Sequence, residues 1–460
     1  MGSNQKKYNT YRLTFGEMVY ESFSYTVAAE GLRMEFTFTL NDKIVFHPTA
    51  TIPLRPFLNF NQPRELMDTL VFNIGMAELV SYWKCVCPKV VRVLPRGLDT
   101  EQVRFWKKLY FNGLGEFFYT NGIRATEEDF MEIVGEGKPL GRGDDKSVTL
   151  ADGYLVPIGG GKDSVVTLEA LRQLPAAGGA EPVIRPLIMN PRGATTLCAA
   201  QGGFAIDEVL VINRTIDPLL LDLNAKGGLN GHTPFSAMLA FYTLLAATLA
   251  GLRNVALSNE SSANEPTVAD STVNHQYSKS LEFENDFRSY AKLYATAGVN
   301  YFSFLRPLSE LQIAMLFAQH EKYFDVFKSC NAGSKQDIWC GHCAKCLFAY
   351  IILSPFIAPE RLDAIFGKPM LDDPEMRTFF EQLTGHTASK PFECVGTISE
   401  VNTALAMTRQ RWYADGKMPT LLKTFDYNGP MTSLETFMPD HNLNDRELRL
   451  LTSAVKATIC

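Results

Sequence analysis

The chain has 460 residues, of which 46% are hydrophobic and 20% charged, and its formal net charge at pH 7 is −6. This composition is typical of a globular protein with ample core-forming residues, and the length predicts two or three domains. The charge is spread over both halves of the chain without a long basic tract, which argues against a nucleic-acid-binding protein.

The N-terminal residues MGSNQKKYNTYRLTF contain no apolar segment, so no signal peptide is expected. Gly2 does not open a myristoylation signal, because Lys6 stands where Ser or Thr is required. The longest uncharged stretch, residues 235–252, is rich in Ala, Ser and Thr and favours a buried helix over a membrane span. The sequence therefore predicts a cytoplasmic, soluble protein with no membrane partner, and it does not indicate the oligomeric state.

Residues 1–145 are expected to form an N-terminal α+β domain. Four apolar residues share one face of an alternating segment: Met34, Phe36, Phe38 and Leu40. The LNDKIV that follows predicts a turn, so a hairpin is expected. Helical spacing then predicts a helix over RELMDTLVFNIGMAELVSYWKCV and another, broken at Asn112-Gly113, over EQVRFWKKLYFNGLGEFFYTNGI. A polar connector at 134–147 marks the expected boundary.

From about residue 150 the pattern changes to alternating strands and helices, with helices expected at 164–174 and 236–251. The candidate strands are 154–158, 183–189, 208–212, 254–258 and 301–305. This alternation predicts an α/β fold with a doubly wound, mainly parallel, Rossmann-like sheet, which binds ligands at the carboxyl ends of its strands. The domain is expected over 150–350. A C-terminal, mostly helical extension is expected over 351–460, with helical patterns at 372–384 and 398–412.

A glycine loop lies between the first predicted strand and helix of this domain, in LVPIGGGKDSVVTLEAL. It consists of Gly159, Gly160, Gly161, Lys162, Asp163 and Ser164. It is not a P-loop, because Asp163 stands where Ser or Thr is required, and Ser164 replaces the last glycine of the dinucleotide fingerprint.

Glycines allow successive N–H groups to turn toward an anion, and a helix N-terminus adds partial positive charge. Lys162 can add a full charge, Asp163 can orient the loop or hold Mg²⁺, and Ser164 suits the helix start and can donate to a phosphate oxygen. A glycine-rich turn without a ligand is the alternative, but turn chemistry alone does not require three glycines followed by Lys-Asp-Ser.

The loop resembles the pyrophosphate loop of the ATP pyrophosphatases, whose pattern is S-G-G-x-D-S, although Gly159 stands at the first serine. The resemblance implies that ATP is cleaved between its α and β phosphates, that a substrate oxygen is adenylated, and that pyrophosphate lies in the loop. ATP and Mg²⁺ are the expected cofactors. Asn190 is a further candidate nucleotide-binding residue.

The chain has nine cysteines, and an odd number in a long chain that is expected to be cytosolic argues against a disulfide framework. Four of them follow a C-x9-C-x2-C-x2-C spacing: Cys330, Cys340, Cys343 and Cys346. This spacing predicts a closed, structural Zn²⁺ site. His342 could replace one thiolate, and an iron–sulfur cluster is the rival, because spacing alone does not exclude it. With RPLSELQIAMLFAQH before it, the cluster resembles the end of the queuosine-pathway nitrile synthases, which supports zinc.

Four polar segments occupy predicted strand ends and loops: LNGHTPFS (229–236), LSNESSANEPT (257–267), NHQYSKS (274–280) and KPFECVGTISE (390–400). Each can be capping or turn chemistry, but together in an α/β enzyme they favour function. The candidate substrate-binding residues in them are Asn259, Glu265 and Glu393.

A wider resemblance rests on FNIGMAELVSYWKCVCPKVV, FWKKLYFNGLGEFFYTNGI, VPIGGGKDS, CGHCAKC and KPFECVGT. From about residue 70 to 400 the chain resembles the UDP-N-acetyl-alpha-D-muramoyl-L-alanyl-L-glutamate epimerases. The resemblance implies an ATP-dependent enzyme of peptidoglycan precursor synthesis. Such an enzyme inverts the terminal L-glutamate of UDP-MurNAc-L-Ala-L-Glu, a small-molecule partner, to D-glutamate.

The chemistry gives this resemblance a reason. The α-hydrogen of a carboxylate is poorly acidic, and adenylation removes the charge that opposes its loss. A base can then take the proton and an acid return it on the other face. The catalytic candidates are Cys394, His232, Glu260, Glu393 and, in the loop, Asp163. Cys394 is preferred because a thiol pKa can be tuned toward neutrality, although a buried cysteine can also simply pack as a small hydrophobe.

Two other functions remain open on the sequence alone. One is another adenylating enzyme that performs nitrile, amide or thiolation chemistry on a small acid or a tRNA. The other is a non-catalytic nucleotide-binding protein, because Gly159 departs from the loop pattern.

Overall fold

The computed structural model describes residues 2–138, 148–174, 182–268, 271, 273–296, 298–413, 416 and 418–459. By residue contacts the chain divides into two compact units, each assembled from separate stretches of sequence. Unit 1 comprises Met1–Leu155, Leu210–Val255 and Gln276–Tyr301, and unit 2 comprises Val156–Val209, Ala256–His275 and Phe302–Cys460. The three consecutive domains expected from the sequence remain a prediction, and most of the connector expected at 134–147 lies outside the described residues.

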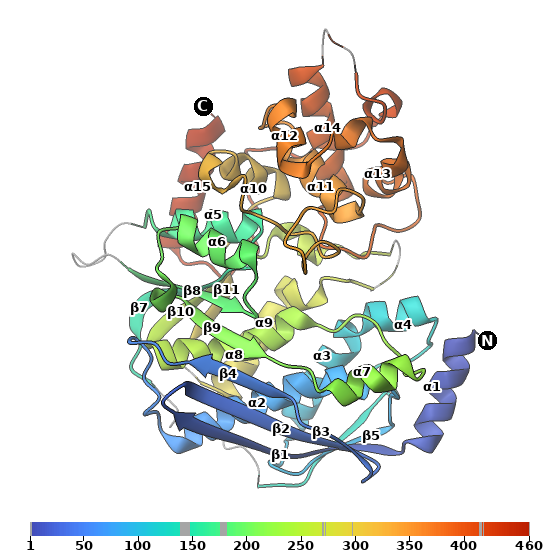
Figure 1. Cartoon of the computed structure of the whole chain (residues 1–460), viewed down its shortest axis with the longest axis vertical. Helices are drawn as coiled ribbons and strands as arrows, with labels where there is room; N and C mark the ends of the chain where they lie inside the picture. Colours follow the sequence, from blue (N-terminus) through green and yellow to red (C-terminus); the bar gives the residue numbers. More distant parts are fainter. Residues whose placement is uncertain are drawn as a thin grey trace. The chain divides into compact units, whose positions relative to one another are not determined.

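The described residues form an α/β fold with a mixed sheet of eleven strands (Figure 1). The strands are β1 (Glu17–Ala28), β2 (Gly31–Leu40), β3 (Ile44–Phe46), β4 (Thr49–Pro53), β5 (Val90–Val93), β6 (Glu132–Gly135), β7 (Ala151–Pro157), β8 (Val183–Met189), β9 (Leu210–Arg214), β10 (Leu252–Leu257) and β11 (Asn300–Ser303). All five strands predicted after residue 150 are therefore confirmed, as β7 to β11.

In unit 1 the N-terminal strands pair as the alternating pattern predicts. β2 is antiparallel to β1, β3 and β4, and the β2–β3 hairpin turns at the predicted LNDKIV. The four apolar residues of β2 that alternate along it are each 0% exposed: Met34, Phe36, Phe38 and Leu40. β4 also pairs antiparallel with β9, with Ala50 opposite Arg214. The sheet is consequently mixed, where the sequence predicted a mainly parallel one; the parallel pairs of unit 1 are β1–β5, β5–β6 and β7–β10.

The helices of unit 1 are α1 (Ser3–Thr14), α2 (Arg64–Trp83), α3 (Thr100–Gly113), α4 (Gly115–Asn121), α7 (Pro218–Ala225), α8 (Phe235–Ala250) and α9 (Leu281–Tyr294). The break predicted at Asn112-Gly113 is the boundary between α3 and α4. α2 packs on β1 and on α8 and is buried almost all round (Figure 1). An aromatic cluster fills the space between α3, α8 and α9, where Trp106 stacks on Phe241 with ring centroids 4.9 Å apart.

Unit 2 carries a helix directly after each of β7 and β8, as in alternating α/β folds. Its helices are α5 (Lys162–Leu171), α6 (Gly193–Gln201), α10 (Glu310–Phe317), α11 (Ala344–Leu353), α12 (Pro359–Phe366), α13 (Arg377–Thr384), α14 (Ile398–Trp412) and α15 (Asp445–Ile459). α11 packs against α12, α13 and α14 in a helical layer (Figure 1). The predicted helical patterns near 164–174, 372–384 and 398–412 are α5, α13 and α14.

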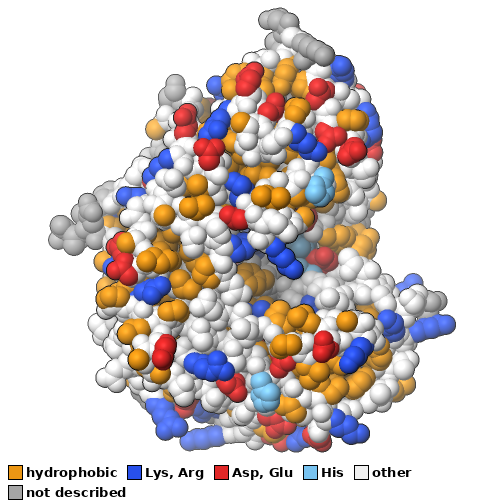
Figure 2. All heavy atoms as spheres, in the orientation of Figure 1, with side chains coloured by type: hydrophobic (Ala, Val, Ile, Leu, Met, Phe, Trp, Pro, Cys, Tyr) orange, Lys and Arg blue, Asp and Glu red, His pale blue; other side chains and the backbone are white. Residues whose placement is uncertain are grey.

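No helix in the described part of the chain is long and apolar enough to cross a membrane. The uncharged stretch from residue 235 forms α8, which has 16 residues, most of them buried. On the face drawn in Figure 2, Lys and Arg side chains are interspersed with Asp and Glu, and no stripe of one sign covers it.

Candidate active site

The glycine loop of unit 2 joins β7 to α5, as its sequence predicts. Gly160 has φ +83°, a left-handed conformation that favours glycine, and a Cβ built there would lie 3.0 Å from the Ala194 Cβ of α6. Gly161 is the N-cap of α5. A Cβ at Gly159 would meet no atom within 4 Å. A side chain at Gly159 would therefore meet no neighbour. A side chain at Gly160 would be disfavoured both by the left-handed backbone and by the closeness of Ala194.

A segment that precedes the cysteine cluster supports this loop. The carbonyl oxygen of Gly160 accepts from the Lys328 amide at 2.8 Å and from the Cys198 Sγ at 3.7 Å. A Cβ at Gly161 would lie 3.2 Å from the Ser329 Cβ. The position of the loop is therefore fixed by α6 on one side and by residues 328–329 on the other.

Three carboxylates meet beside the loop: Asp163, Glu260 and Glu310 each offer an oxygen within 4.8 Å of the others. Asp163 is part of the loop, Glu260 precedes the short 3₁₀ turn Ser261–Asn264, and Glu310 is the first residue of α10. The Lys162 ammonium contacts both Asp163 and Glu310. Hard oxygen ligands in this number suit a divalent cation such as Mg²⁺.

Burial and charge shift the pKa values in this cluster. Burial alone would lower the pKa of Lys162, but the Asp163 and Glu310 carboxylates outweigh burial and raise it. Burial raises the pKa of Glu310, opposed by Lys162 but reinforced by the carboxylates of Asp163 and Glu260. Without a bound cation, Glu310 therefore holds its proton more strongly than an exposed glutamate does.

A pocket of about 390 Å³ lies next to Glu310 in unit 2. Its lining includes Ser261, Ser262, Glu265, Arg306, Ser309 and Glu400. Arg306 is 1% exposed and donates from Nη1 to the Glu260 carbonyl oxygen at 2.7 Å. Glu400 accepts from the Glu310 backbone N–H at 2.8 Å, which ties the start of α10 to α14. The pocket thus combines hydroxyl groups with charges of both signs, beside the carboxylate cluster.

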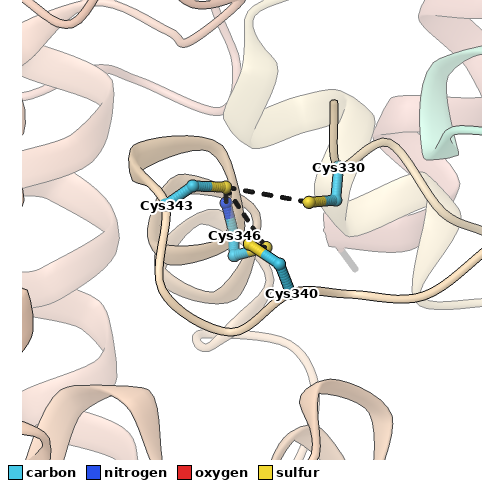
Figure 3. A group of neighbouring side chains, drawn as sticks. All are labelled: Cys330, Cys340, Cys343 and Cys346. Carbon is cyan, nitrogen blue, oxygen red and sulfur yellow. Dashed lines mark hydrogen bonds between the residues drawn. The ribbon is translucent and has the colours of Figure 1, made fainter. Parts of the chain in front are cut away.

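The four predicted metal-binding cysteines come together in unit 2, with their sulfur atoms pointing toward one another (Figure 3). The Sγ–Sγ distances are 3.8 Å for Cys330–Cys343, 3.6 Å for Cys340–Cys346 and 3.5 Å for Cys343–Cys346. The Gly333 amide also donates to Cys330 Sγ at 3.1 Å. The His342 Nδ1 lies 2.7 Å from the Cys340 carbonyl oxygen, and this ring is outside the group of four ligand atoms.

Glu393 and Cys394 lie between the cysteine cluster and the carboxylates. Glu393 accepts from the Asn331 side chain at 2.6 Å, and burial raises its pKa. Two residues after Cys394, a Cβ at Gly396 would lie 2.8 Å from Glu400 Oε2 and 3.3 Å from Glu310 Cγ. The segment from Glu393 to Gly396 therefore runs from the cluster to the start of α10, with Cys394 partly exposed along it.

The other candidates in unit 2 have identifiable contacts. Asn259 is 8% exposed and donates to Ser303 Oγ at 3.0 Å, and Ser164 donates to the Gly161 carbonyl oxygen at 3.0 Å. Glu265 forms an ion pair with Lys390. Asn190, exposed at the end of β8, has φ +52°. A non-glycine residue in this conformation is uncommon, and such residues are enriched at functional sites.

His232 belongs to unit 1. Its Nδ1 is 3.4 Å from Glu116 Oε2. Next to it, Lys84 donates to the Gly231 carbonyl oxygen, and burial lowers the pKa of Lys84 to about 8. Sequence reasoning singled out His232 but neither Glu116 nor Lys84.

Sequence reasoning also missed Glu310, Glu400 and Arg306 in unit 2. The sequence patterns around Glu310 and Glu400 are those of helix starts and do not indicate a functional role. Ser309-x-x-Gln312 and Thr397-x-x-Glu400 are capping boxes that mark helix starts. The acidic Glu310 interrupts an apolar run, but nothing local connects it to a loop 148 residues earlier at Lys162.

The fold and this site define an α/β protein in which a glycine loop between a strand and a helix, a group of carboxylates and a four-cysteine cluster occur in one unit. Family models described as the MurL N-terminal domain and the MurL C-terminal domain match residues 9–304 and 326–427. Three curated relatives share the name UDP-N-acetyl-alpha-D-muramoyl-L-alanyl-L-glutamate epimerase.

The relative from a Micromonospora species is 38% identical over 72% of this chain and 73% of its own. That from Xanthomonas oryzae pv. oryzae is 35% identical over 82% of each chain, and that from Salinispora tropica is 38% identical over 71% and 70%. No solved structure matches the chain. The chain belongs to this family of epimerases, as the resemblance predicted.

Proposed function

We propose that the protein is an ATP-dependent epimerase that inverts the terminal L-glutamate of UDP-MurNAc-L-Ala-L-Glu to D-glutamate. The names of the three relatives, at 35–38% identity over most of both chains, support this activity and substrate. The enzyme would act in peptidoglycan precursor synthesis, in the cytoplasm, where its nucleotide-linked substrate is made.

The observation that carries the ATP-dependent chemistry is the glycine loop with carboxylates at its edge. β7, the loop and α5 support an ATP pyrophosphatase type of nucleotide site, in which loop N–H groups and the α5 N-terminus hold the leaving pyrophosphate. Asp163, Glu260 and Glu310 would hold Mg²⁺. When bound, Mg²⁺ would neutralise charge that develops on the phosphates.

The proposed reaction begins at the α-carboxylate of the substrate glutamate. A carboxylate oxygen attacks the α-phosphorus of ATP and pyrophosphate leaves, which gives an acyl-adenylate without the carboxylate charge. A base removes the α-proton, and the proton is returned on the opposite face. Water then attacks the acyl carbonyl, which releases AMP and the product carboxylate.

Cys394 is the preferred residue for proton exchange, with His232 and Glu260 as the other candidates. Cys394 is partly exposed and lies two residues from Gly396, which packs against Glu310 and Glu400. Asn259, Glu265 and Glu393 are proposed substrate contacts. Asn190 is a proposed nucleotide contact, because of its position at the end of β8.

The cysteine cluster is proposed to hold one structural Zn²⁺. Zinc–sulfur bonds of about 2.3 Å in a tetrahedron separate the sulfurs by about 3.8 Å, close to the distances of 3.5–3.8 Å between these Sγ atoms. An iron–sulfur cluster binds its cysteines through different iron atoms and would hold the sulfurs farther apart. Four protein ligands leave no open position, so zinc here would stabilise the fold.

Product analysis tests the proposed use of ATP. The protein incubated with ATP, Mg²⁺ and UDP-MurNAc-L-Ala-L-Glu should form AMP and pyrophosphate, and the same mixture without the dipeptide substrate should form little. ADP and phosphate as products would contradict the loop assignment. Adenylation of a tRNA or of another small acid in place of this substrate would favour the second candidate, a different adenylating enzyme.

A further inference from the structure

The lysine of the glycine loop, Lys162, already forms ion pairs with carboxylates. Lys162 is only 8% exposed at its side chain and contacts both Asp163 and Glu310. Asp163, Glu260 and Glu310 together carry three negative charges when ionised, against one ammonium. A divalent cation would bring this group to neutrality and no further. Another cation at the loop would add to the loop N–H groups and the α5 N-terminus in offsetting the several negative charges of a bound polyphosphate.

Lys328 occupies the right place for that cation. Its backbone amide donates to the Gly160 carbonyl oxygen at 2.8 Å, so the residue lies directly against the middle of the loop. Its neighbour Ser329 lies against Gly161. The Lys328 ammonium donates to the Asp325 carbonyl oxygen at 2.9 Å, one turn back along the chain, rather than to a carboxylate.

The charge of Lys328 also affects Cys198, a residue that contacts the loop. Cys198 donates from Sγ to the same Gly160 carbonyl oxygen. Burial raises the pKa of Cys198 to about 12, and the positive charge of Lys328 opposes that rise. The Lys328 backbone amide and the Cys198 Sγ thus share one acceptor, the Gly160 carbonyl oxygen. Asp337 and Asp325 are the acidic groups that act on the Lys328 ammonium. Asp337 also accepts from the Ala194 amide at 2.8 Å, at the start of α6.

The backbone of this segment is held by the cysteine cluster. Cys330 follows Ser329 directly, and its sulfur accepts from the Gly333 amide. An ion bound by the four sulfurs would thus fix the chain two residues from Lys328. Besides stabilising the fold, the cluster would therefore restrain the backbone next to Lys328.

We propose that Lys328 binds the polyphosphate of ATP at the glycine loop. This inference rests on the proposed function and adds a binding residue to it. The Lys328 side chain would turn from the Asp325 carbonyl to the phosphate oxygens, exchanging a neutral acceptor for a charged one.

Titration calorimetry of Lys328→Met with Mg·ATP and with Mg²⁺ and inorganic pyrophosphate tests the proposal. Loss of one hydrogen bond to a charged group should weaken binding of both ligands about 10- to 100-fold. Lys335→Met is the matched control, because Lys335 is exposed in the same loop and its loss removes the same charge. It should bind both ligands as the parent does. Lys328→Arg, which keeps the charge, should recover most of the affinity.

Two results would overturn the inference: parental affinity in Lys328→Met, or Lys328→Arg binding as weakly as Lys328→Met. Thermal melts of each variant show whether it is folded. If the parent itself binds neither ligand, the proposed function fails, which is distinct from failure of Lys328 alone.

Discussion

The first two glycines of the loop differ in what they tolerate. Gly159 faces open space and Gly160, at φ +83°, lies against α6. Gly160→Ala should therefore cost about 1–2 kcal/mol in backbone strain and weaken ATP binding, because the loop must shift. Gly159→Ser should change the free energy of unfolding by less than about 0.5 kcal/mol and supply the hydroxyl of the S-G-G-x-D-S pattern.

Chemical denaturation and ATP titration of the two variants check this difference. Equal loss of stability in both would contradict the loop geometry. Tighter ATP binding by Gly159→Ser would show that the open position faces the phosphates.

Glu310 should make stability depend on pH. Burial raises its pKa, so the metal-free folded state keeps a proton that an unfolded glutamate loses above about pH 4.3. The folded state then binds more protons than the unfolded state, and the free energy of unfolding should fall as pH rises through this window. Mg²⁺ should displace the proton, so its affinity should rise with pH.

Glu310→Gln should reduce this pH slope and the stabilisation by Mg²⁺, measured by thermal melts from about pH 5 to 7. Glu321→Gln is the control, because Glu321 is exposed. If the free energy of unfolding of Glu310→Gln depends on pH as that of the parent does, the proton belongs to another group.

At the residue scale, local sequence motifs predict only some of the residues of the candidate site. Asp163 follows from the loop pattern and Glu260 from a polar run after a strand. Glu310, Glu400 and Lys328 could not be found in this way, because tertiary packing alone brings them to the loop. A capping box explains Glu400 locally, and Lys328 belongs to no motif.

At the scale of elements, the cysteine cluster should bind one zinc per chain. Removal of the metal by a strong chelator, or Cys343→Ser, should cost several kcal/mol, because structural zinc contributes folding free energy. About 1 kcal/mol shifts the Tm by about 2–4 °C in a unit of this size, so a fall of roughly 10 °C is expected. Cys85→Ser, at a buried cysteine outside the cluster, is the control that should leave the zinc content unchanged.

Elemental analysis measures the zinc content of each variant, and thermal melts measure its Tm. Iron with sulfide, or a fully stable protein without metal, would refute the zinc assignment.

The strands and helices themselves were largely predictable. Alternating burial in β2 is a direct consequence of period-two geometry, and the apolar runs in β7 to β11 are typical of strands buried on both faces. The pairing between them was not predictable, since β4 meets β9 across 164 residues, from Ala50 to Arg214, and hydrophobic pattern does not specify partners. The antiparallel pairs that β2 forms with β1, β3 and β4, together with β4–β9, make the sheet mixed.

At the scale of the whole molecule, proton exchange and adenylation should be separable. Cys394→Ala should still form AMP-linked intermediate from ATP, but solvent deuterium should enter the α-carbon about 10²- to 10⁴-fold more slowly, as expected for loss of a general acid–base group. Cys394→Ser should be nearly as slow, because a hydroxyl is a far weaker acid than a thiol. His232→Asn is the parallel variant, and exchange lost there but kept in Cys394→Ala would transfer the role to His232.

The proposed function depends most on inversion of the glutamate through its acyl-adenylate. The parent protein, ATP, Mg²⁺ and UDP-MurNAc-L-Ala-L-Glu are incubated in D₂O, and the glutamate is then analysed for α-deuterium and chirality. We predict D-glutamate that carries deuterium at the α-carbon, formed only when ATP is present. L-glutamate without deuterium after ATP has been consumed, or inversion that needs no ATP, would contradict the account.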